Sequence, residues 1–152
     1  MTGPVFVDTN VLVYRSDASD PLKQARADAW YGLLWRSRAG RLSFQVLQEL
    51  YSALTRKLSC GFDAHEAREI VRELMEWKPI PVDRIVLERA WSLEDRCSLS
   101  WWDALIVAAA QTCECDVLLT EDLQHGQMFG SVRVVSPFAT PDSTPADILA
   151  AL

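Results

Sequence analysis

Short runs of consecutive apolar residues, without the polar alternation of a half-exposed strand, constrain the fold of this chain more than any other feature. Val5–Val7 and Val117–Leu119 are such runs, and Val132–Val135 is a third candidate strand. Strands of uninterrupted apolar residues are buried on both faces, which is typical of a largely parallel sheet with helices on each side. The sequence therefore predicts an α/β fold with a doubly covered sheet.

The segments between these runs have helical periodicity and recognisable start signals. Helices are expected from 21 to about 38, over the apolar positions Val46, Leu47, Leu50, Leu54 and Leu58, after Asp63, after Asp83, from 100 to about 113, and as a last turn at 146–152. Residues 79–82 are expected to be extended at a sheet edge, because prolines cannot donate to a ladder. No linker interrupts this alternation, so 1–152 is expected to be a single domain.

Composition and charge exclude several classes of protein. Hydrophobic residues make up 49% and charged residues 24% of the 152 residues, a globular balance that gives no indication of disorder. The net charge of −6 argues against a protein that binds polyanions by bulk charge alone. No signal peptide and no stretch long enough for a bilayer are recognisable, so a soluble cytoplasmic protein is expected.

The cysteines give no indication of a metal or disulfide framework. They have neither the CxxC spacing nor the neighbouring histidine pair of a zinc site, and a reducing cytosol disfavours disulfides. Free thiols are therefore expected at Cys60, Cys97, Cys113 and Cys115.

Acidic residues mark the ends of two of the predicted strands. Asp8 follows the first apolar run, and Glu121 and Asp122 follow the second after Thr120. In open α/β sheets, ligands bind outside the carboxyl ends of the strands. Each acid alone also has an ordinary explanation as an Asx turn, a helix cap or a surface charge. The sequence does not decide whether Glu121 or Asp122 points inward.

Two further acids lie on predicted helices. Asp103 is the only polar residue of 101–110, so the sequence predicts a helix that is buried on every side and contains a carboxylate. Such a carboxylate must be protonated, paired, hydrogen-bonded or bound to a metal. The alternative is a capping box in which Asp103 reaches back to the Ser100 amide. Glu49 lies away from the centre of the apolar arc of its helix and, taken alone, is expected to be solvated.

If Asp8, Glu49, Asp103 and Asp122 converge, their mutual repulsion requires a cation. A set of oxygen ligands without His or Cys suits Mg²⁺ or Mn²⁺ rather than zinc. Ions held in this way promote phosphodiester hydrolysis, and they bring a phosphate to a site that an acidic protein would otherwise repel. The residues thus indicate a metal-dependent phosphodiesterase.

Basic and aromatic residues offer two further interpretations. Arg36, Arg38 and Arg41 form a cluster that would bind an RNA backbone if it flanked the acids, although a solvated helix end is the ordinary explanation. The six tryptophans mostly occupy helical core positions, so they are not expected to stack on bases, and some are candidates for a homodimer or partner surface.

Four segments together resemble a known family. They are Asp8 to Tyr14, Glu49 between Gln48 and Leu50, the stretch 102–110 around Asp103, and the stretch 119–124 that contains Thr120, Glu121 and Asp122. In order and spacing they resemble the PIN-domain ribonucleases of the VapC toxin type, the toxins of type II toxin–antitoxin systems. The match spans nearly the whole chain.

The resemblance implies a three-layer α/β/α sandwich with a mainly parallel sheet and a Mg²⁺- or Mn²⁺-dependent endoribonuclease. It also implies a homodimer, and a cognate antitoxin that inserts a segment into or near the acidic pocket. By position, Asp8, Glu49 and Asp103 resemble the core metal ligands and Asp122 the fourth acid. Asn10 and Thr120 match supporting polar positions, and Glu121 remains an alternative to Asp122.

Two other functions stay open from the residues. One is a Mg²⁺-dependent phosphatase with Asp8 as nucleophile, although Asn10 stands where that chemistry usually has a second acid. The other is a non-catalytic module whose acids are caps and whose tryptophan-rich helices bind a protein. Added Mn²⁺ should stabilise a carboxylate cluster and should not stabilise scattered acids.

Overall fold

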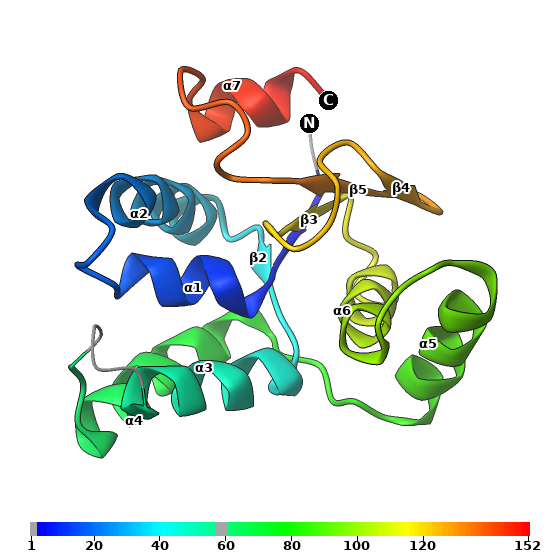
Figure 1. Cartoon of the computed structure of the whole chain (residues 1–152), viewed down its shortest axis with the longest axis horizontal. Coiled ribbons are helices and arrows are strands. Elements are labelled where there is room, and N and C mark those ends of the chain that lie inside the picture. The colour runs from blue at the N-terminus through cyan, green and yellow to red at the C-terminus, as the bar shows by residue number, and fades with distance from the viewer. Residues whose placement is uncertain (1–2, 57–60) are drawn as a thin grey trace.

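Within residues 3–56 and 61–152, which the computed structural model describes, five strands form one sheet in the order β2-β1-β3-β5-β4 (Figure 1). Leu58 and Cys60 lie outside these residues. Four strands run parallel and β4 is antiparallel to β5. The strands are β1 (Val5–Val7), β2 (Gly40–Arg41), β3 (Val117–Leu119), β4 (Met128–Phe129) and β5 (Val132–Val135).

Helices lie on both faces of the sheet. The helix bounds are α1 (Thr9–Arg15), α2 (Pro21–Ser37), α3 (Phe44–Arg56), α4 (Ala64–Leu74), the 3₁₀ turn η1 (Met75–Trp77), α5 (Arg84–Arg96), α6 (Trp101–Thr112) and α7 (Pro145–Ala150). In Figure 1, α1 and α2 lie on one side of the strands, and α6 with α5 outside it lies on the other. The predicted fold class, an α/β/α sandwich around a mainly parallel sheet, is confirmed.

Local sequence explains where these helices begin. The expected caps are present, because Asp63 accepts from the Glu66 amide at 2.8 Å, Asp83 from the Val86 amide at 3.1 Å, and Ser100 from the Asp103 amide at 3.1 Å. α2 starts at Pro21, the first-turn position that proline favours. Residues 79–82 are extended as expected, and Ile80 forms a parallel bridge with Ser43.

The sequence did not predict α1, β2 or β4. The segment from Asp8 to Asn10 is compatible with a turn or a helix cap, and the structure shows the cap: Asp8 is the N-cap of α1 and accepts from the Thr9 amide at 2.7 Å. The chain therefore passes from strand to helix without a loop. β4 has only two residues and is defined by its pairing with β5. No local sequence pattern predicts this pairing.

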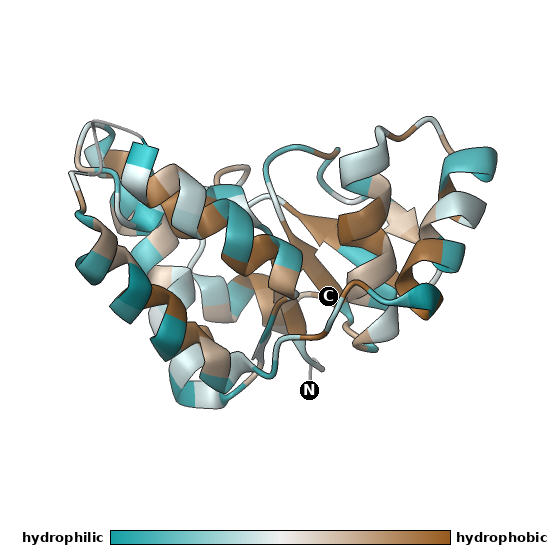
Figure 2. Ribbon diagram, turned by 90° about the horizontal axis from the view of Figure 1, so that it is seen from below, coloured by the Kyte–Doolittle hydropathy of each residue, from teal (hydrophilic) through white to brown (hydrophobic). Residues whose placement is uncertain are grey.

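The core lies between the sheet and the inner faces of the helices. β1 and β3 are buried at every residue, and so is the α6 stretch from Ala104 to Ala110. Figure 2 shows the strands as hydrophobic, while the outer helices alternate between hydrophobic and hydrophilic turns. The expectation that the tryptophans mostly occupy core positions is wrong for Trp91 and Trp102, whose exposed fractions are 48% and 63%.

The state of the cysteines and the presence of membrane-spanning helices can be examined in the described part of the chain. Cys97, Cys113 and Cys115 are free thiols, as expected. None of the described helices combines the length and the apolar character needed to cross a membrane.

The shared direction of the parallel strands distinguishes two sides of the sheet, which run across the strand ends and not along its outer strands. We call the side where β1 and β3 end the carboxyl edge, and the side where they begin the amino edge. From β1 the chain passes through α1 and α2 to β2 on one side, and it later returns to β3 on the other side. The order thus reverses between β1 and β3, and this reversal is where ligands bind in open α/β sheets.

Candidate active site

Asp8 and Thr120 meet at the point where the strand order reverses. The Asp8 amide donates to the Leu119 carbonyl at 3.0 Å, which continues the β1–β3 pairing to the carboxyl edge. The Thr120 hydroxyl donates to Asp8 Oδ2 at 2.8 Å, and the Thr9 amide donates to Oδ1 at 2.7 Å. Asp8 is only 6% exposed, so these donors hold a carboxylate that is almost removed from water.

Asn10 links the ends of both strands through its side-chain amide. Its Nδ2 lies 3.3 Å from Asp8 Oδ2, 3.1 Å from Thr120 Oγ1 and 3.0 Å from Asp122 Oδ2. The Asp122 amide in turn donates to Thr120 Oγ1 at 3.1 Å. The predicted supporting residues Asn10 and Thr120 thus contact the predicted acids Asp8 and Asp122 directly.

Glu49 reaches this network from α3. The Thr9 hydroxyl donates to Glu49 Oε2 at 2.8 Å, and Gln45 Nε2 donates to Oε1 at 3.0 Å. Glu49 is half-buried, so its interpretation as a solvated glutamate is wrong. The sequence reasoning missed Thr9 and Gln45. The available signal for Gln45 was its position one helical turn before Glu49, on the same face of α3.

Asp103 lies in the first turn of α6, where the helix begins to emerge from the core. The expectation of burial on every side holds from Ala104 onward but is wrong for this turn, because Asp103 is half-buried and Trp102 is exposed. Ser100 caps the Asp103 amide at 3.1 Å, which is one half of the predicted capping box.

The electrostatics connect all four predicted acids. Burial raises the pKa of Asp8 to about 7, the Thr120 and Thr9 hydrogen bonds oppose this rise, and the charges of Asp122 and Glu49 add to it. Burial also raises the pKa of Asp103, Ser100 opposes the rise, and again the charges of Asp122 and Glu49 contribute. Two buried or half-buried aspartates therefore feel the same two neighbouring carboxylates.

Glu121 and Asp122 differ in their contacts. Asp122 is exposed and is bound to Asn10 within the network. Both carboxylate oxygens of Glu121 are occupied elsewhere, by the Tyr14 hydroxyl at 2.6 Å and by Lys23 Nζ at 2.9 Å. The structure thus associates Asp122, and not Glu121, with the other acids.

The donor set is chemically suited to a hard divalent cation, because it consists of carboxylate oxygens. Among the described residues, however, no three His, Cys, Asp or Glu side chains are arranged as a ready ligand set. Hydroxyl and amide groups of Thr9, Asn10 and Thr120 hold three of the carboxylates instead. A cation bound here would have to compete with these donors for the carboxylate oxygens.

The predicted arginine cluster lies elsewhere. Gly40 pairs with Val5, the first residue of β1, so Arg36 and Arg38 at the end of α2 precede the amino edge. Arg41 Nη1 bonds to the carbonyls of Arg38 and Gly40 at 3.0 and 2.8 Å. These arginines therefore lie at the opposite edge from the acids. Their role in binding an RNA backbone depended on flanking the acids, and this placement does not support it.

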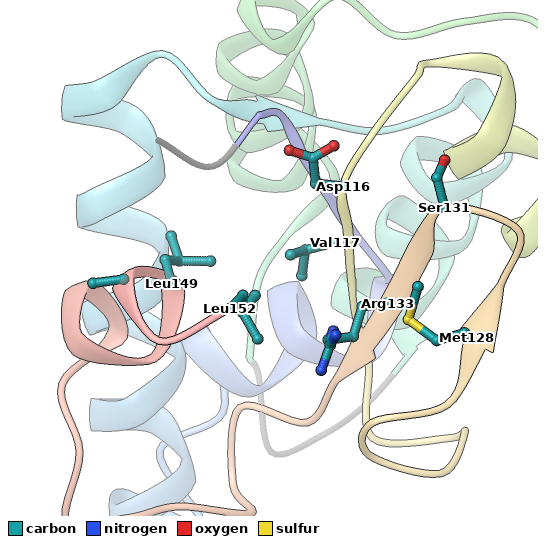
Figure 3. Close-up of a pocket in the computed structure, with 8 residues that line it drawn as sticks. Asp116, Val117, Met128, Ser131, Arg133, Leu149 and Leu152 are labelled. Carbon is teal, nitrogen blue, oxygen red and sulfur yellow. The ribbon is translucent and has the colours of Figure 1, made fainter.

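A pocket of about 410 Å³ also lies at the amino edge (Figure 3). Asp116 and Arg133 contribute its charged groups, and Leu149 and Leu152 from the C-terminal segment contribute apolar surface. It contains none of the predicted site residues. The candidate site is therefore the open carboxyl edge and not this pocket.

Comparison with known proteins gives the family. The family model described as the PIN domain matches residues 5–128. The chain belongs to the PIN domain family. No curated protein matches the sequence.

Solved structures share the fold of this PIN domain at low sequence identity. A toxin–antitoxin complex from Klebsiella pneumoniae matches with a TM-score of 0.63 and 20% identity over 88% of this chain and 98% of that chain. FitAcB from Neisseria gonorrhoeae matches with a TM-score of 0.62 and 20% identity over 89% and 99%. VapC20 from Mycobacterium tuberculosis, a sarcin-ricin loop cleaving toxin, matches with a TM-score of 0.55 and 21% identity over 75% and 86%.

Proposed function

We propose that this PIN domain is a Mg²⁺- or Mn²⁺-dependent endoribonuclease that hydrolyses RNA phosphodiesters. One observation carries the proposal: Asp8, Glu49, Asp103 and Asp122 share one electrostatic environment at the reversal point of the sheet. The charges of Glu49 and Asp122 raise the pKa of both Asp8 and Asp103, and carboxylates that repel in this way are poorly tolerated without a cation. Membership of the PIN family and the likeness to a toxin that cleaves RNA support the same activity.

In this proposal Asp8, Glu49, Asp103 and Asp122 hold the ion. When bound, the ion would supply the Lewis acidity that polarises a phosphodiester and lowers the pKa of water. The chain's own contribution is orientation: Thr9 directs Glu49, Asn10 directs Asp122, and Thr120 directs Asp8. The α1 and α6 N-termini, at Asp8 and Ser100, add the positive end of a helix dipole to the same edge.

We further propose that the protein is the toxin of a toxin–antitoxin pair, acts in the cytoplasm, and forms a homodimer. Support for the antitoxin partner comes from the solved neighbours, among them the Klebsiella pneumoniae complex and VapBC2 of Rickettsia felis, which was solved bound to a DNA fragment from its promoter. Co-expression with the neighbouring reading frame tests the partner: a small protein that copurifies and suppresses RNA cleavage is the expected result.

The decisive experiment replaces single carboxylates by amides. Asp8→Asn and Asp103→Asn should lower RNA cleavage in Mn²⁺ about 1000-fold, because a metal ion contributes several kcal/mol to the transition state. Asp95→Asn on α5, an exposed aspartate, is the matched control and should cleave at the wild-type rate. Circular dichroism checks that each variant is folded.

Two results would contradict this function. Undiminished cleavage by folded Asp8→Asn or Asp103→Asn would remove these residues from the chemistry. A folded wild-type protein that neither gains thermal stability in millimolar Mn²⁺ nor cleaves RNA would favour the non-catalytic module. Hydrolysis of small phosphate esters without RNA cleavage would favour the phosphatase.

A further inference from the structure

We propose that Lys23 and Tyr14 are positioning residues that hold Glu121 away from the carboxylate set, so that Asp122 alone of this acidic pair serves the site. The part of this inference that concerns metal binding rests on the proposed function. Its structural part concerns the turn from Thr120 to Asp122 and can be tested on the metal-free protein.

The contacts of Glu121 carry the first step. Tyr14 on α1 donates its hydroxyl to Glu121 Oε1 at 2.6 Å, and Lys23 on α2 donates to Oε2 at 2.9 Å. Lys23 Nζ also lies 3.1 Å from the Tyr14 hydroxyl, so the three side chains form a closed triangle. Each oxygen of the carboxylate already has a strong donor, one of them a full charge.

Aromatic rings hold the ammonium group in place. Lys23 Nζ lies 4.5 Å from the centre of the Tyr14 ring and 4.8 Å from that of Phe138, distances at which a cation is attracted to a ring face. The Tyr14 and Phe138 rings themselves meet edge to face at 5.2 Å. The hydrogen bond to Glu121 raises the pKa of Lys23, so the group stays charged. This cation is therefore fixed by several contacts and is not a freely moving surface lysine.

The same contacts determine the geometry of the turn. Thr120, Glu121 and Asp122 follow one another directly at the end of β3. The Glu121 amide approaches Asn10 Oδ1 at 3.4 Å, while the Asp122 amide bonds to Thr120 Oγ1 at 3.1 Å. Because Glu121 is held by residues of α1 and α2, it is Asp122 that contacts Asn10 and lies toward the other acids.

The charge balance supports this assignment. Lys23 offsets Glu121, so the turn adds one uncompensated carboxylate, that of Asp122, to Asp8, Glu49 and Asp103. A released Glu121 would be a second negative group beside Asp122, free to compete for an ion. Partners that orient a metal ligand typically change metal affinity by about 10- to 100-fold when removed.

The first experiment measures amide hydrogen exchange in the metal-free protein. Lys23→Met and Tyr14→Phe should speed exchange of the Glu121 and Asp122 amides about tenfold, whereas Lys23→Arg should keep the wild-type rates. Asp28→Asn is the matched control, because it breaks another ion pair between α1 and α2, Arg15 with Asp28 at 3.2 Å. Wild-type exchange rates in both Lys23→Met and Tyr14→Phe would overturn the proposal.

The second experiment measures Mn²⁺ affinity by calorimetry without RNA. Glu121→Gln should change the affinity by less than about twofold in the otherwise unchanged protein, but by about tenfold in the Lys23→Met background, where Glu121 is free to bind the ion. Asp122→Asn alone should weaken binding about tenfold or more. Equal losses for Glu121→Gln and Asp122→Asn would show that Glu121 is already a ligand, and would overturn the proposal.

The two experiments separate this inference from the proposed function. A wild-type protein that binds no Mn²⁺ contradicts the metal site and, with it, the second part of this inference. The exchange rates still decide whether Lys23 and Tyr14 hold the turn. Normal Mn²⁺ binding by the wild type, with no difference between the two backgrounds, leaves the proposed function intact and overturns only the inference.

Discussion

The two edges of the same sheet differ in the charge of the side chains that gather there. At the carboxyl edge, Asp8 and Asp122 meet beside Glu49 and Asp103. At the amino edge, cationic side chains gather around aromatic rings, in a cavity of about 470 Å³ lined by Trp35, Arg38, Gly40, Arg41, Glu76, Trp77 and Lys78. The direction of the helices accounts for the difference, because α1 and α6 begin at the acidic edge while α2 ends at the basic one. Helix N-termini favour anions, and helix C-termini favour cations.

The comparison shows that the charge distribution of this protein follows the direction of its helices. An excess of acids gives the chain a net charge of −6, yet the cations are not spread evenly between the edges. The charges of Glu49 and Asp122 raise the pKa of Asp8 and Asp103 at the carboxyl edge, whereas Arg38 and Lys78 lie in left-handed C-cap positions at the ends of α2 and η1. Carboxylates that repel one another mark the candidate functional site, and charges that only complement a helix end are expected to stabilise the fold.

The largest expected effect is a pH dependence of stability, which arises because Asp8 is buried close to other carboxylates. Folded Asp8 keeps its proton up to a pH of about 7, while the ordinary pKa is 3.8. The folded state then binds more protons than the unfolded state, so the free energy of unfolding of the metal-free protein should fall as the pH rises from about 4 to about 7. The fall should be a few kcal/mol, because a tenfold change in proton affinity corresponds to about 1.4 kcal/mol.

Denaturant titrations in EDTA at successive pH values measure this fall. Asp8→Asn should abolish most of it, and added Mn²⁺ should oppose it by stabilising the ionised carboxylate. Arg38→Gln at the amino edge should leave it unchanged. A pH dependence in Asp8→Asn as steep as in the wild type would mean that Asp8 is not the group responsible.

The second prediction concerns the loss of stability when packing at the amino edge is disturbed. A Cβ added to Gly40 would lie 2.6 Å from Cδ2 of the buried Trp77 ring, so Gly40→Ala should destabilise the protein by about 1–3 kcal/mol. Gly32→Ala is the matched control on α2, because its Cβ would meet only the flexible end of Arg36 at 3.1 Å. Thermal unfolding measures both variants. A Tm for Gly40→Ala equal to that of Gly32→Ala would refute the close approach to Trp77.

The third prediction concerns a substitution that removes hydrogen bonds at the carboxyl edge while keeping all four acids. Thr120→Val removes the hydroxyl that donates to Asp8 and accepts from Asn10 and Asp122. We expect a loss of about 1 kcal/mol in stability and of about tenfold in Mn²⁺ affinity. Thr120→Ser keeps the hydroxyl and should behave like the wild type. If Thr120→Val also bound Mn²⁺ normally, the hydroxyl would have no role in orienting the acids.

The smallest effect concerns the basic cluster. Because Arg38 and Arg41 lie at the amino edge, Arg38→Ala and Arg41→Ala should change cleavage of a short single-stranded RNA by less than about twofold. The slope of log affinity against log salt should also stay the same, since no phosphate contact is lost. Weaker binding together with a shallower slope would place these arginines on the RNA path after all.

Local sequence was sufficient for three of the five strands and for the position of Asp8 and Asp122. Uninterrupted apolar runs identify β1 and β3, and the rule for open α/β sheets then predicts that Asp8 and Asp122 lie at one edge. N-cap residues predicted the starts of α4, α5 and α6 for the same reason, because each cap acts within one turn.

Features that depend on distant pairing could not be predicted in this way. The edge at which Arg41 lies depends on the parallel direction in which β2 pairs with β1. The different contacts of Glu121 and Asp122 depend on where α1 and α2 place Tyr14 and Lys23. The exposure of Trp102 depends on which elements pack against the first turn of α6. Periodicity within a segment carries no information about any of these contacts.

The four acids of the candidate site differ in their exposure to solvent. Asp8 is almost fully buried, Glu49 and Asp103 are half-buried, and Asp122 is exposed. If the proposed metal site holds an ion, Asp122 would be the ligand in contact with solvent and Asp8 the ligand shielded from it. Substitutions of Asp122 should therefore alter mainly how fast an ion is captured, and substitutions of Asp8 how long it remains.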